Sequence, residues 1–452
     1  MKRHQGWLTD WNPEDEDVWA AGGHKVARRN LFYSVASEHV AFSVWTLWSV
    51  LALFMSPESG LNLDPSQKFL LVTTPTLVGA LLRLPYSYAV TRMGGRNWTV
   101  LATLALLVPT ALATWLIQQP GTPLWALVAV AALAGIGGGN FASSMTNVTA
   151  FYPQRHQGWA LGLNAGGGNL GVAVVQLLGL AVATLYGVRH PAYIACIYLP
   201  VIVITAVMCG RYMDNVAAVR TPPGAQREAA RTGHTWLISA LYVGTFGSFI
   251  GYGFAFGLVL QNQFGATPVQ AVSYTFLGPL LGSLTRPLGG RLADRCGAAR
   301  VTFWTFLAMA AGTGVLVVAA TWQQFGLFVA GFVTLFVLSG IGNGSTYKLI
   351  PVVFAAKAEQ EVTAGADASE AFARQRRLAG AVIAIAGAVG AVGGAAINFA
   401  FKLSYSGHHA SGIPAFCAFI GYYAACMLLL RAVYLRKPTA QRAAADRERA
   451  RV

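Results

Sequence analysis

The chain has 452 residues, of which 55% are hydrophobic and only 11% are charged, and its formal net charge is +15. The apolar residues form long runs, which excludes a soluble enzyme or a soluble binding module. The basic residues flank these runs instead of gathering on one face with exposed aromatic residues, so we expect no nucleic-acid partner.

A membrane-spanning helix needs about 20 mostly apolar residues, and the chain contains twelve such runs. We predict an all-α membrane protein with twelve transmembrane helices, at residues 31–55, 69–92, 98–118, 123–152, 158–187, 191–212, 235–261, 267–293, 299–320, 324–354, 377–404 and 411–435. The 50 glycines fit this prediction, because small residues let membrane helices pack closely.

The polar first 30 residues are predicted to form a cytoplasmic N-terminal segment (1–30). The first apolar run is too long for a cleavable signal peptide, and no Ala-x-Ala-like site follows it. With this orientation, 26 of the 32 Lys and Arg residues lie on the cytoplasmic side, three lie on the other side, and three lie inside spans. This is the positive-inside distribution. It predicts a multi-pass protein of the cell membrane with both termini in the cytoplasm.

The sequence repeats itself at one spacing. Pairs of identical residues separated by 203 positions are Gly79 and Gly282, Arg83 and Arg286, Arg92 and Arg295, Gly94 and Gly297, Asn140 and Asn343, and Phe151 and Phe354. We predict two six-helix bundles (31–212 and 235–435), a cytoplasmic linker (213–234) and a basic cytoplasmic tail (436–452). Parallel halves of this kind place a substrate site between them at the midplane.

The turn after the eighth run, residues 290–300, has the pattern Gly-x-x-x-Asp-Arg-x-Gly-x-x-Arg. It resembles the loop motif of the major facilitator superfamily, whose fold we therefore expect. An acid at a helix end can pair with neighbouring helix ends and hold one conformation, so Asp294, Arg295 and Gly297 are candidate gating residues. The first-half copy has Thr91 in place of the acid.

Arg83 and Arg286 each lie seven to nine residues from the cytoplasmic end of a span, or roughly 10–13 Å at ~1.5 Å per residue. An arginine at that depth costs on the order of 2.5–3.5 kcal/mol. The only one of the 17 acids inside a span is Glu38, nearer the cytoplasmic end, so we expect no protein counter-ion at the depth of the arginines. The sequence predicts a small anion as the substrate, since a planar guanidinium suits a planar or bidentate oxyanion; phosphorylated organic anions also satisfy this argument.

Residues 160–171 (ALGLNAGGGNLG) place two amides, Asn164 and Asn169, among glycines in the fifth span. The glycines there, like those of the eleventh span, are read as helix-packing residues, whereas the amides can donate to an anion without repelling it. The five cysteines have no metal-like spacing and are read as packing residues, so we expect no metal and no cofactor.

The same segment resembles a signature of the nitrate/nitrite porter family, in particular its NarK-type branch. Nearly the whole chain shares this resemblance, including residues 10–15, 81–87, 139–145, 245–251 and 342–346. The resemblance implies a substrate site for nitrate and nitrite built from Arg83, Arg286, Asn169, Phe42, Phe141, Tyr242 and Phe246. Ordinary packing is the alternative reading of the four aromatic residues. The resemblance also implies a functional link with a nitrate reductase.

This sequence departs from the family at Glu38, His39 and Lys348, and in the eleventh span at Asn398. Glu38 and Lys348 lie at similar depth, so they are candidates for a gating pair, while Glu38 and His39 are candidates for proton coupling; a pair without a transport role, reaching toward water, is the alternative. We expect nitrate/nitrite exchange by alternating access, because the midplane lacks an acid. Proton-coupled nitrate symport is the alternative. An anion channel, a carrier of another small oxyanion and a membrane-embedded enzyme remain further options.

Overall fold

The computed structural model describes residues 3–4, 7–56, 60–216, 224–406 and 410–435. The predicted basic tail (436–452) and residues 217–223 of the predicted linker lie outside the described residues. Six long helical rods precede a short helix, α10 (Ala225–Ala230), in the described chain. They are α2 (His24–Leu51) with η2 (Ala52–Phe54), α3 (Pro65–Met93), α4 (Gly95–Ala105) with α5 (Leu107–Leu116), α6 (Leu124–Ala134) with α7 (Ile136–Phe151), α8 (Gln154–Leu185) and α9 (Ala192–Tyr212).

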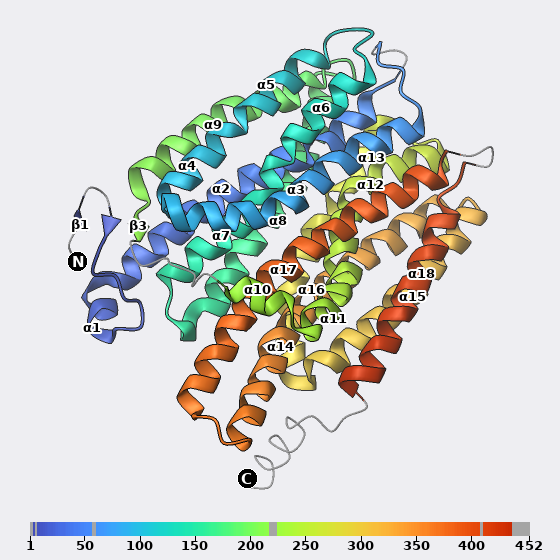
Figure 1. Ribbon diagram of the computed structural model, residues 1–452. Coiled ribbons are helices and arrows are strands. Elements are labelled where there is room, and N and C mark those ends of the chain that lie inside the picture. Colours follow the sequence, from blue (N-terminus) through green and yellow to red (C-terminus); the bar gives the residue numbers. More distant parts are fainter. Residues whose placement is uncertain (1–2, 5–6, 57–59, 217–223, 407–409, 436–452) are drawn as a thin grey trace.

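Six further rods follow α10 in the described part of the chain. They are α11 (Gly233–Tyr242), η4 (Val243–Gly247) and α12 (Ser248–Phe264); α13 (Pro268–Thr275) with α14 (Leu277–Cys296); α15 (Ala298–Thr321); α16 (Phe325–Thr363); α17 (Ala368–Ser404); and α18 (Ile413–Leu430) with η5 (Arg431–Leu435). Figure 1 shows the rods before α10 on one side of the molecule and those after it on the other, with α3 beside α17.

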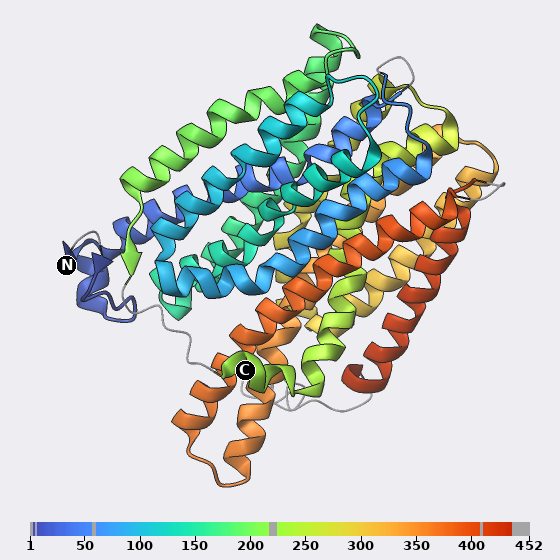
Figure 2. The same cartoon turned by 45° about the horizontal axis from the view of Figure 1, so that its top comes forward.

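Eleven helices in the described residues are long and apolar enough to cross a membrane. The rod that falls short is α13–α14, although its place in the bundle matches that of the others (Figures 1 and 2). It carries three arginines and an aspartate within α14, and these charges lower its mean hydropathy. The bundle in the described residues therefore consists of eleven strongly apolar helical rods and one charged rod.

Two predicted helix boundaries are wrong by several turns. The predicted spans 324–354 and 377–404 are parts of longer helices, α16 and α17, which continue into a hairpin beyond the apolar runs. The added residues are charged but include many good helix formers such as Ala, Glu and Gln. Asp367 caps α17 by accepting from the Glu370 backbone N–H at 2.9 Å. Hydropathy alone marks where the apolar run ends, not where the helix ends.

A small three-stranded sheet was not predicted. The strand β2 (Trp7–Leu8) pairs antiparallel with β1 (Arg3–His4) and parallel with β3 (Asn215–Val216), which follows α9. Two further elements, α1 (Glu16–Val18) and η1 (Trp19–Gly23), connect this sheet to α2, and the Trp11 indole N–H donates to the Ala150 carbonyl at 2.9 Å. The chain before the first span is thus folded against the end of the sixth.

Contacts between the two groups of rods include several near the helix ends remote from the N-terminal sheet. The Gln261 side chain donates to the Leu53 carbonyl at 2.9 Å, and the ring of Phe69 stacks on Tyr405 with centroids 5.3 Å apart. Deeper in the bundle, Gln176 donates to the Gly253 carbonyl at 3.0 Å. These contacts close that end of the interface.

Candidate functional site

Arg83 lies on α3 with its side chain 1% exposed. Its Nη1 donates to the Gly387 carbonyl of α17 at 2.7 Å. Its guanidinium carbon lies 4.6 Å from the centre of the Phe141 ring and 5.1 Å from that of Phe246, within the range of cation–π attraction. Its Nε and Nη2 have no hydrogen-bond partner among the described residues. One N–H group of the guanidinium is therefore anchored to the backbone, while two other nitrogens remain available as donors.

Arg286 occupies the equivalent place on α14 and is 8% exposed. Its Nη2 donates to the Tyr242 hydroxyl at 3.2 Å, and its guanidinium carbon lies 5.5 Å from the Tyr347 ring. In the described structure its Nη1 lacks a partner. The two halves thus supply one anchored arginine each, with a free donor on both.

Four aromatic rings join the two arginines. Tyr242 and Phe246 stack with centroids 5.0 Å apart and planes 7° from parallel, so the ring pair contacts Arg286 at one end and Arg83 at the other. Phe141 lies 6.1 Å from both Phe246 and Phe42. Residues 243–247 form a π-helical turn, η4; such turns are frequent at functional sites. The structure brings together both predicted arginines and all four predicted aromatic residues.

Asn169 on α8 is fully buried, and neither atom of its amide has a partner in the described chain. A buried amide without a partner costs free energy unless a ligand or water satisfies it. The role of Asn169 in anion binding stays a prediction.

The residue count placed no carboxylate at the depth of the arginines, but one lies within electrostatic range of both. Glu38 of α2 is fully buried and interacts electrostatically with both Arg83 and Arg286. Its Oε2 accepts from the Asn164 amide at 2.5 Å. Counting residues along α2 located Glu38 nearer the cytoplasmic end but could not show which way its side chain points.

The candidate gating pair of Glu38 and Lys348 does not form in this structure. The Lys348 Nζ lies 2.8 Å from the Asp294 carboxylate and joins α16 to α14 at a half-exposed position. His39 contacts the Gly167 carbonyl through Nδ1 at 3.1 Å. Of the other candidate gating residues, Arg295 is exposed, and Gly297 ends α14 with φ +88°, a backbone conformation that favours glycine.

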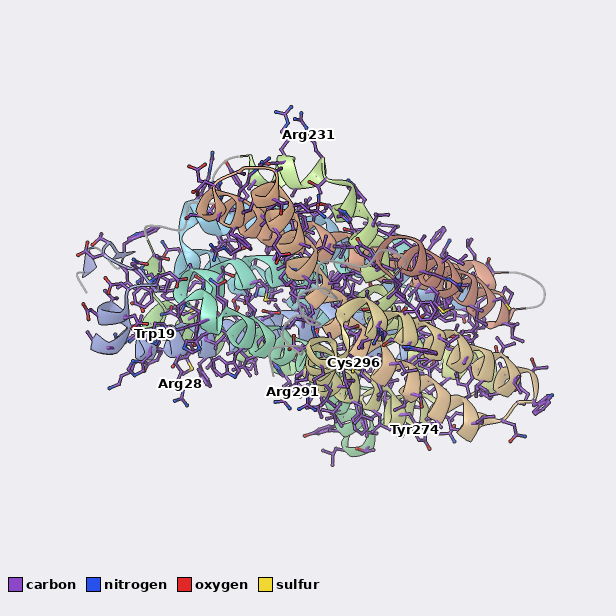
Figure 3. The ribbon with its side chains drawn as sticks, turned by 90° about the horizontal axis from the view of Figure 1, so that it is seen from below. Trp19, Arg28, Arg231, Tyr274, Arg291 and Cys296 are labelled. Atoms are coloured by element: carbon purple, nitrogen blue, oxygen red, sulfur yellow. The ribbon has the colours of Figure 1, made fainter. Side chains whose placement is uncertain are left out.

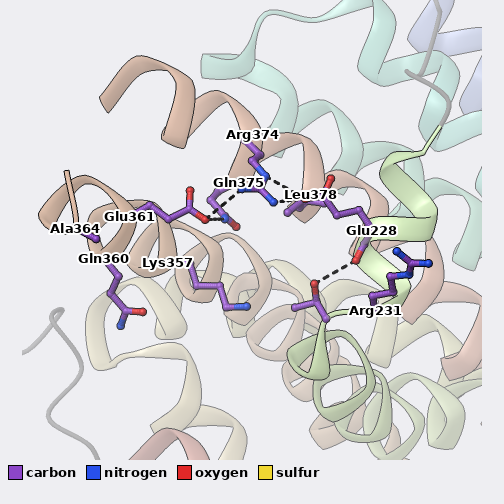
Figure 4. Close-up of a pocket in the computed structure, with 10 residues that line it drawn as sticks. Glu228, Arg231, Lys357, Gln360, Glu361, Ala364, Arg374, Gln375 and Leu378 are labelled. Atoms are coloured by element: carbon purple, nitrogen blue, oxygen red, sulfur yellow. Dashed lines mark hydrogen bonds and ion pairs between the residues drawn. The ribbon is translucent and has the colours of Figure 1, made fainter. Parts of the chain in front are cut away.

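A surface cavity of about 500 Å³ lies elsewhere, between α10 and the hairpin of α16 and α17. In Figure 4 its charged side chains face one another: Arg374 is 2.5 Å from Glu228 and 3.8 Å from Glu361, and Gln375 donates to Glu361 at 2.6 Å. These groups largely satisfy each other outside the bundle, so this cavity is a poor candidate for the substrate site.

Comparison with known proteins places the chain in a family. Residues 40–397 match the Major Facilitator Superfamily. This protein belongs to that superfamily. A solved member of the fold, a D-xylose–proton symporter, covers 91% of this chain and 97% of its own with a TM-score of 0.64 at 15% identity. The superfamily comprises membrane transporters, so the chain is a multi-pass membrane protein and not an enzyme.

Within the superfamily, the chain is 36% identical to the nitrate/nitrite transporter NarU of Salmonella typhimurium, over 96% of this chain and 97% of that one. It is 34% identical to a probable nitrate/nitrite antiporter, NarK2 of Thermus thermophilus, over 77% of this chain and 83% of that one. The family membership predicted from the sequence motifs is confirmed.

Sequence reasoning missed two contributors to this superfamily member's central site. Tyr347, whose hydroxyl has no partner in the described structure, follows the repeated Asn343 by one helical turn, and that repeat was the available signal. The Gly387 carbonyl, which holds Arg83, carried no side-chain signal because it belongs to the backbone.

Proposed function

We propose that this protein carries nitrate and nitrite across the cell membrane by alternating access, with both termini in the cytoplasm. The observation that supports this most strongly is the pair of buried arginines from equivalent positions of the repeat, each anchored on one side and each with an unpartnered donor. The names of the full-length relatives support the choice of anion.

The chemistry of the site suits a small planar anion. Guanidinium donors bind oxyanions through directed, charge-assisted hydrogen bonds, and positively polarised ring edges favour a flat anion between aromatic side chains. Tyr347 and Asn169 add neutral donors that leave the charge of the site unchanged. A larger phosphorylated anion is less well matched, because the rings of Phe141 and Phe246 lie against Arg83.

Exchange of nitrate for nitrite is the coupling mode that we propose. Burying unpaired positive charge while the carrier changes conformation is costly, and a bound monovalent anion reduces that cost. Loaded carriers therefore reorient more readily than empty ones. A nitrate reductase on the cytoplasmic side would supply the nitrite for such an exchange.

A second candidate mode is proton-coupled nitrate symport. It is favoured by one observation, the buried carboxyl of Glu38 within electrostatic range of both arginines. A titratable group linked to the anion site is what such coupling requires.

Counterflow in proteoliposomes tests the proposal. Labelled nitrate is offered to liposomes loaded with nitrite, loaded with chloride, or subjected to an inward proton gradient. Uptake that depends on internal nitrite supports exchange, whereas accumulation in nitrite-free liposomes driven by the proton gradient supports symport. Correct insertion and a sharp unfolding transition show that the reconstituted protein is folded. If such protein takes up no nitrate under any condition, nitrate transport is contradicted.

A further inference from the structure

A carboxyl group lies next to the arginine pair without forming an ion pair with it. Glu38 is fully buried in α2. Its Oε2 accepts from Asn164 on α8 at 2.5 Å, while its Oε1 has no hydrogen-bond partner in the described structure. The Asn164 amide nitrogen also lies 2.7 Å from the Ser144 hydroxyl of α7. The carboxyl is thus held by neutral groups from two helices.

The glycine-rich segment of α8 makes room for this group. A Cβ atom added at Gly168 would lie 2.6 Å from Glu38 Oε1, closer than van der Waals contact allows. The next residue of α2, His39, faces the carbonyl of Gly167. Gly168 therefore does more than allow close helix packing, since a side chain at this position would displace the Glu38 carboxyl.

Two full positive charges act on Glu38 from elements across the bundle, Arg83 of α3 and Arg286 of α14. From α16 the phenol of Tyr347 is also within electrostatic range. The remaining neighbours are neutral: Ser144 and Asn164 near the carboxyl itself, Thr103 of α4 at Ser37, and Tyr198 of α9 at Ser43. Burial favours the neutral acid and the arginines favour the carboxylate. The balance between the two forms consequently depends on how much of the arginine charge is neutralised.

The surroundings can satisfy both forms of the carboxyl. Asn164 donates through Nδ2 to the carboxylate, and its Oδ1 has no partner among the described residues. If the amide turns over, Oδ1 accepts from the O–H of the protonated acid. A site that serves as donor to one form and acceptor to the other can bind and release a proton with little rearrangement.

We propose that Glu38 is a proton-binding site linked to the anion site, and that it holds its proton more tightly when an anion is bound than when the carrier is empty. This inference rests on the proposed function. The proton comes from water on the side to which the carrier is open, and it leaves when the anion leaves; no covalent bond other than the carboxyl O–H forms or breaks. Because a bound anion cancels part of the arginine potential at Glu38, anion and proton each favour binding of the other.

This linkage changes which carrier forms can reorient. With Glu38 ionised, the two arginines and the carboxylate leave the empty site with one net positive charge instead of two. Reorientation of the empty carrier is then less costly, so net uptake of an anion together with a proton becomes available beside exchange. Removing the carboxylate returns the site to two uncompensated charges and restricts it to exchange.

The test is a nitrate titration of the purified full-length protein between about pH 5 and 9, with chloride keeping the ionic strength constant. We expect the affinity of the wild type to rise as pH falls, by up to about tenfold per pH unit, the limit for one linked proton. Glu38→Gln should bind nitrate with an affinity that is independent of pH over this range. Glu370→Gln, the same substitution at an exposed position of α17, should behave as the wild type.

A second variant guards against misfolding of Glu38→Gln. Gly168→Ala keeps the Glu38 carboxyl but crowds it, so the pH range over which nitrate affinity changes should move. Glu38→Asp keeps a carboxyl, so its nitrate affinity should still depend on pH. A wild-type slope retained in Glu38→Gln, a wild type without a slope, or a slope abolished by His39→Ala and not by Glu38→Gln would overturn the inference. Failure of the folded wild type to bind nitrate at any pH would instead contradict the proposed function.

Discussion

The two turns at equivalent positions of the repeat, after α3 and after α14, are held in different ways. Gly94 and Gly297 both end a helix with positive φ, +85° and +88°, so the backbone repeats. In the first half, the Asn215 side chain accepts from the backbone N–H groups of Arg96 and Asn97 at 2.9 and 3.3 Å. In the second half, the corresponding fastening is the Asp294–Lys348 ion pair.

The side chains that hold the two turns differ in their exposure to solvent. Asp214, beside Asn215, is buried and bonded to Arg29 and Asn30 at 2.5 and 2.9 Å. The side chains of Asp294 and Lys348 are 56% and 46% exposed, so water weakens their attraction. Where the first copy of the motif lacks its acid at Thr91, residues from beyond the sixth helix fasten the turn instead. The first turn is therefore held by hydrogen bonds to the buried Asn215 side chain, and the second by an exposed ion pair.

The largest predicted effect is a loss of nitrate uptake when an arginine of either half is replaced, compared with the same replacement of an arginine outside the site. Arg83→Lys and Arg286→Lys should each reduce nitrate uptake about 30-fold or more, because an ammonium cannot keep both the anchoring bond and a directed donor, a loss of roughly 2 kcal/mol or more. Uptake into proteoliposomes at equal protein content measures this. Arg92→Lys, at an exposed helix end, serves as the control. Near-normal uptake by a folded Arg83→Lys protein would refute anion binding by directed guanidinium hydrogen bonds.

The second prediction compares the contacts that hold the two turns. Asp214→Ala should lower the free energy of unfolding by about 1–3 kcal/mol, because the buried amide of Asn30 and the partly exposed guanidinium of Arg29 lose their acceptor. Asp294→Ala should change it by less than about 0.5 kcal/mol, as expected for an exposed pair. Thermal unfolding of both variants in the same detergent gives the comparison. Equal losses of stability would show that the two turns are fastened equally.

The third prediction concerns the anion that the arginines of both halves are proposed to bind. Nitrate at ten times its dissociation constant should stabilise the folded protein by about 1.4 kcal/mol. Chloride at the same ionic strength should stabilise it much less, since a spherical ion does not match the directed N–H donors of two guanidinium groups. The unfolding temperature in matched salts measures this. Identical shifts with the two salts would mean that screening, and not a site, is responsible.

The smallest effect on binding is expected from Asp294→Asn. Nitrate affinity should stay within about twofold, because the residue lies at a helix end remote from the arginines, while the balance between outward-open and inward-open forms should shift. Labelling rates of a cysteine introduced at the end of the bundle that carries Asp294 report that balance. Lys348→Gln should give the same shift, and the double variant should add nothing further if the pair is responsible.

The repeated residues were the part of the site that sequence reasoning could predict. Arg83 and Arg286 are rare charges at equal depth in two matching helices, and their cost in a membrane demands a partner. Side-chain direction was not predictable in the same way. Glu38 and Lys348 have similar depth on separate helices, yet Glu38 faces the bundle interior and Lys348 faces Asp294, because depth says nothing about rotation around a helix axis.

The fold was predicted where apolar runs decide it and missed where local geometry does. Strands of two residues, such as β2 and β3, carry no detectable periodicity. The hairpin of α16 and α17 extends through polar residues that helix propensity supports and hydropathy ignores. The basic residues that indicated the cytoplasmic side include Arg28 and Arg231, which point away from the ribbon in Figure 3, as expected for side chains that reach water.

The pairing of β2 with β3 has a consequence for the order in which the protein is made. Synthesis runs from the N-terminus, so Trp7 and Leu8 leave the ribosome early but cannot find their partner strand until Asn215 and Val216 have followed. The N-terminal segment must wait through the insertion of six helices. Its partner strand is nonetheless complete before the arginine-bearing α14 of the second bundle is synthesised, so the first bundle can be joined to its N-terminal segment without waiting for the second.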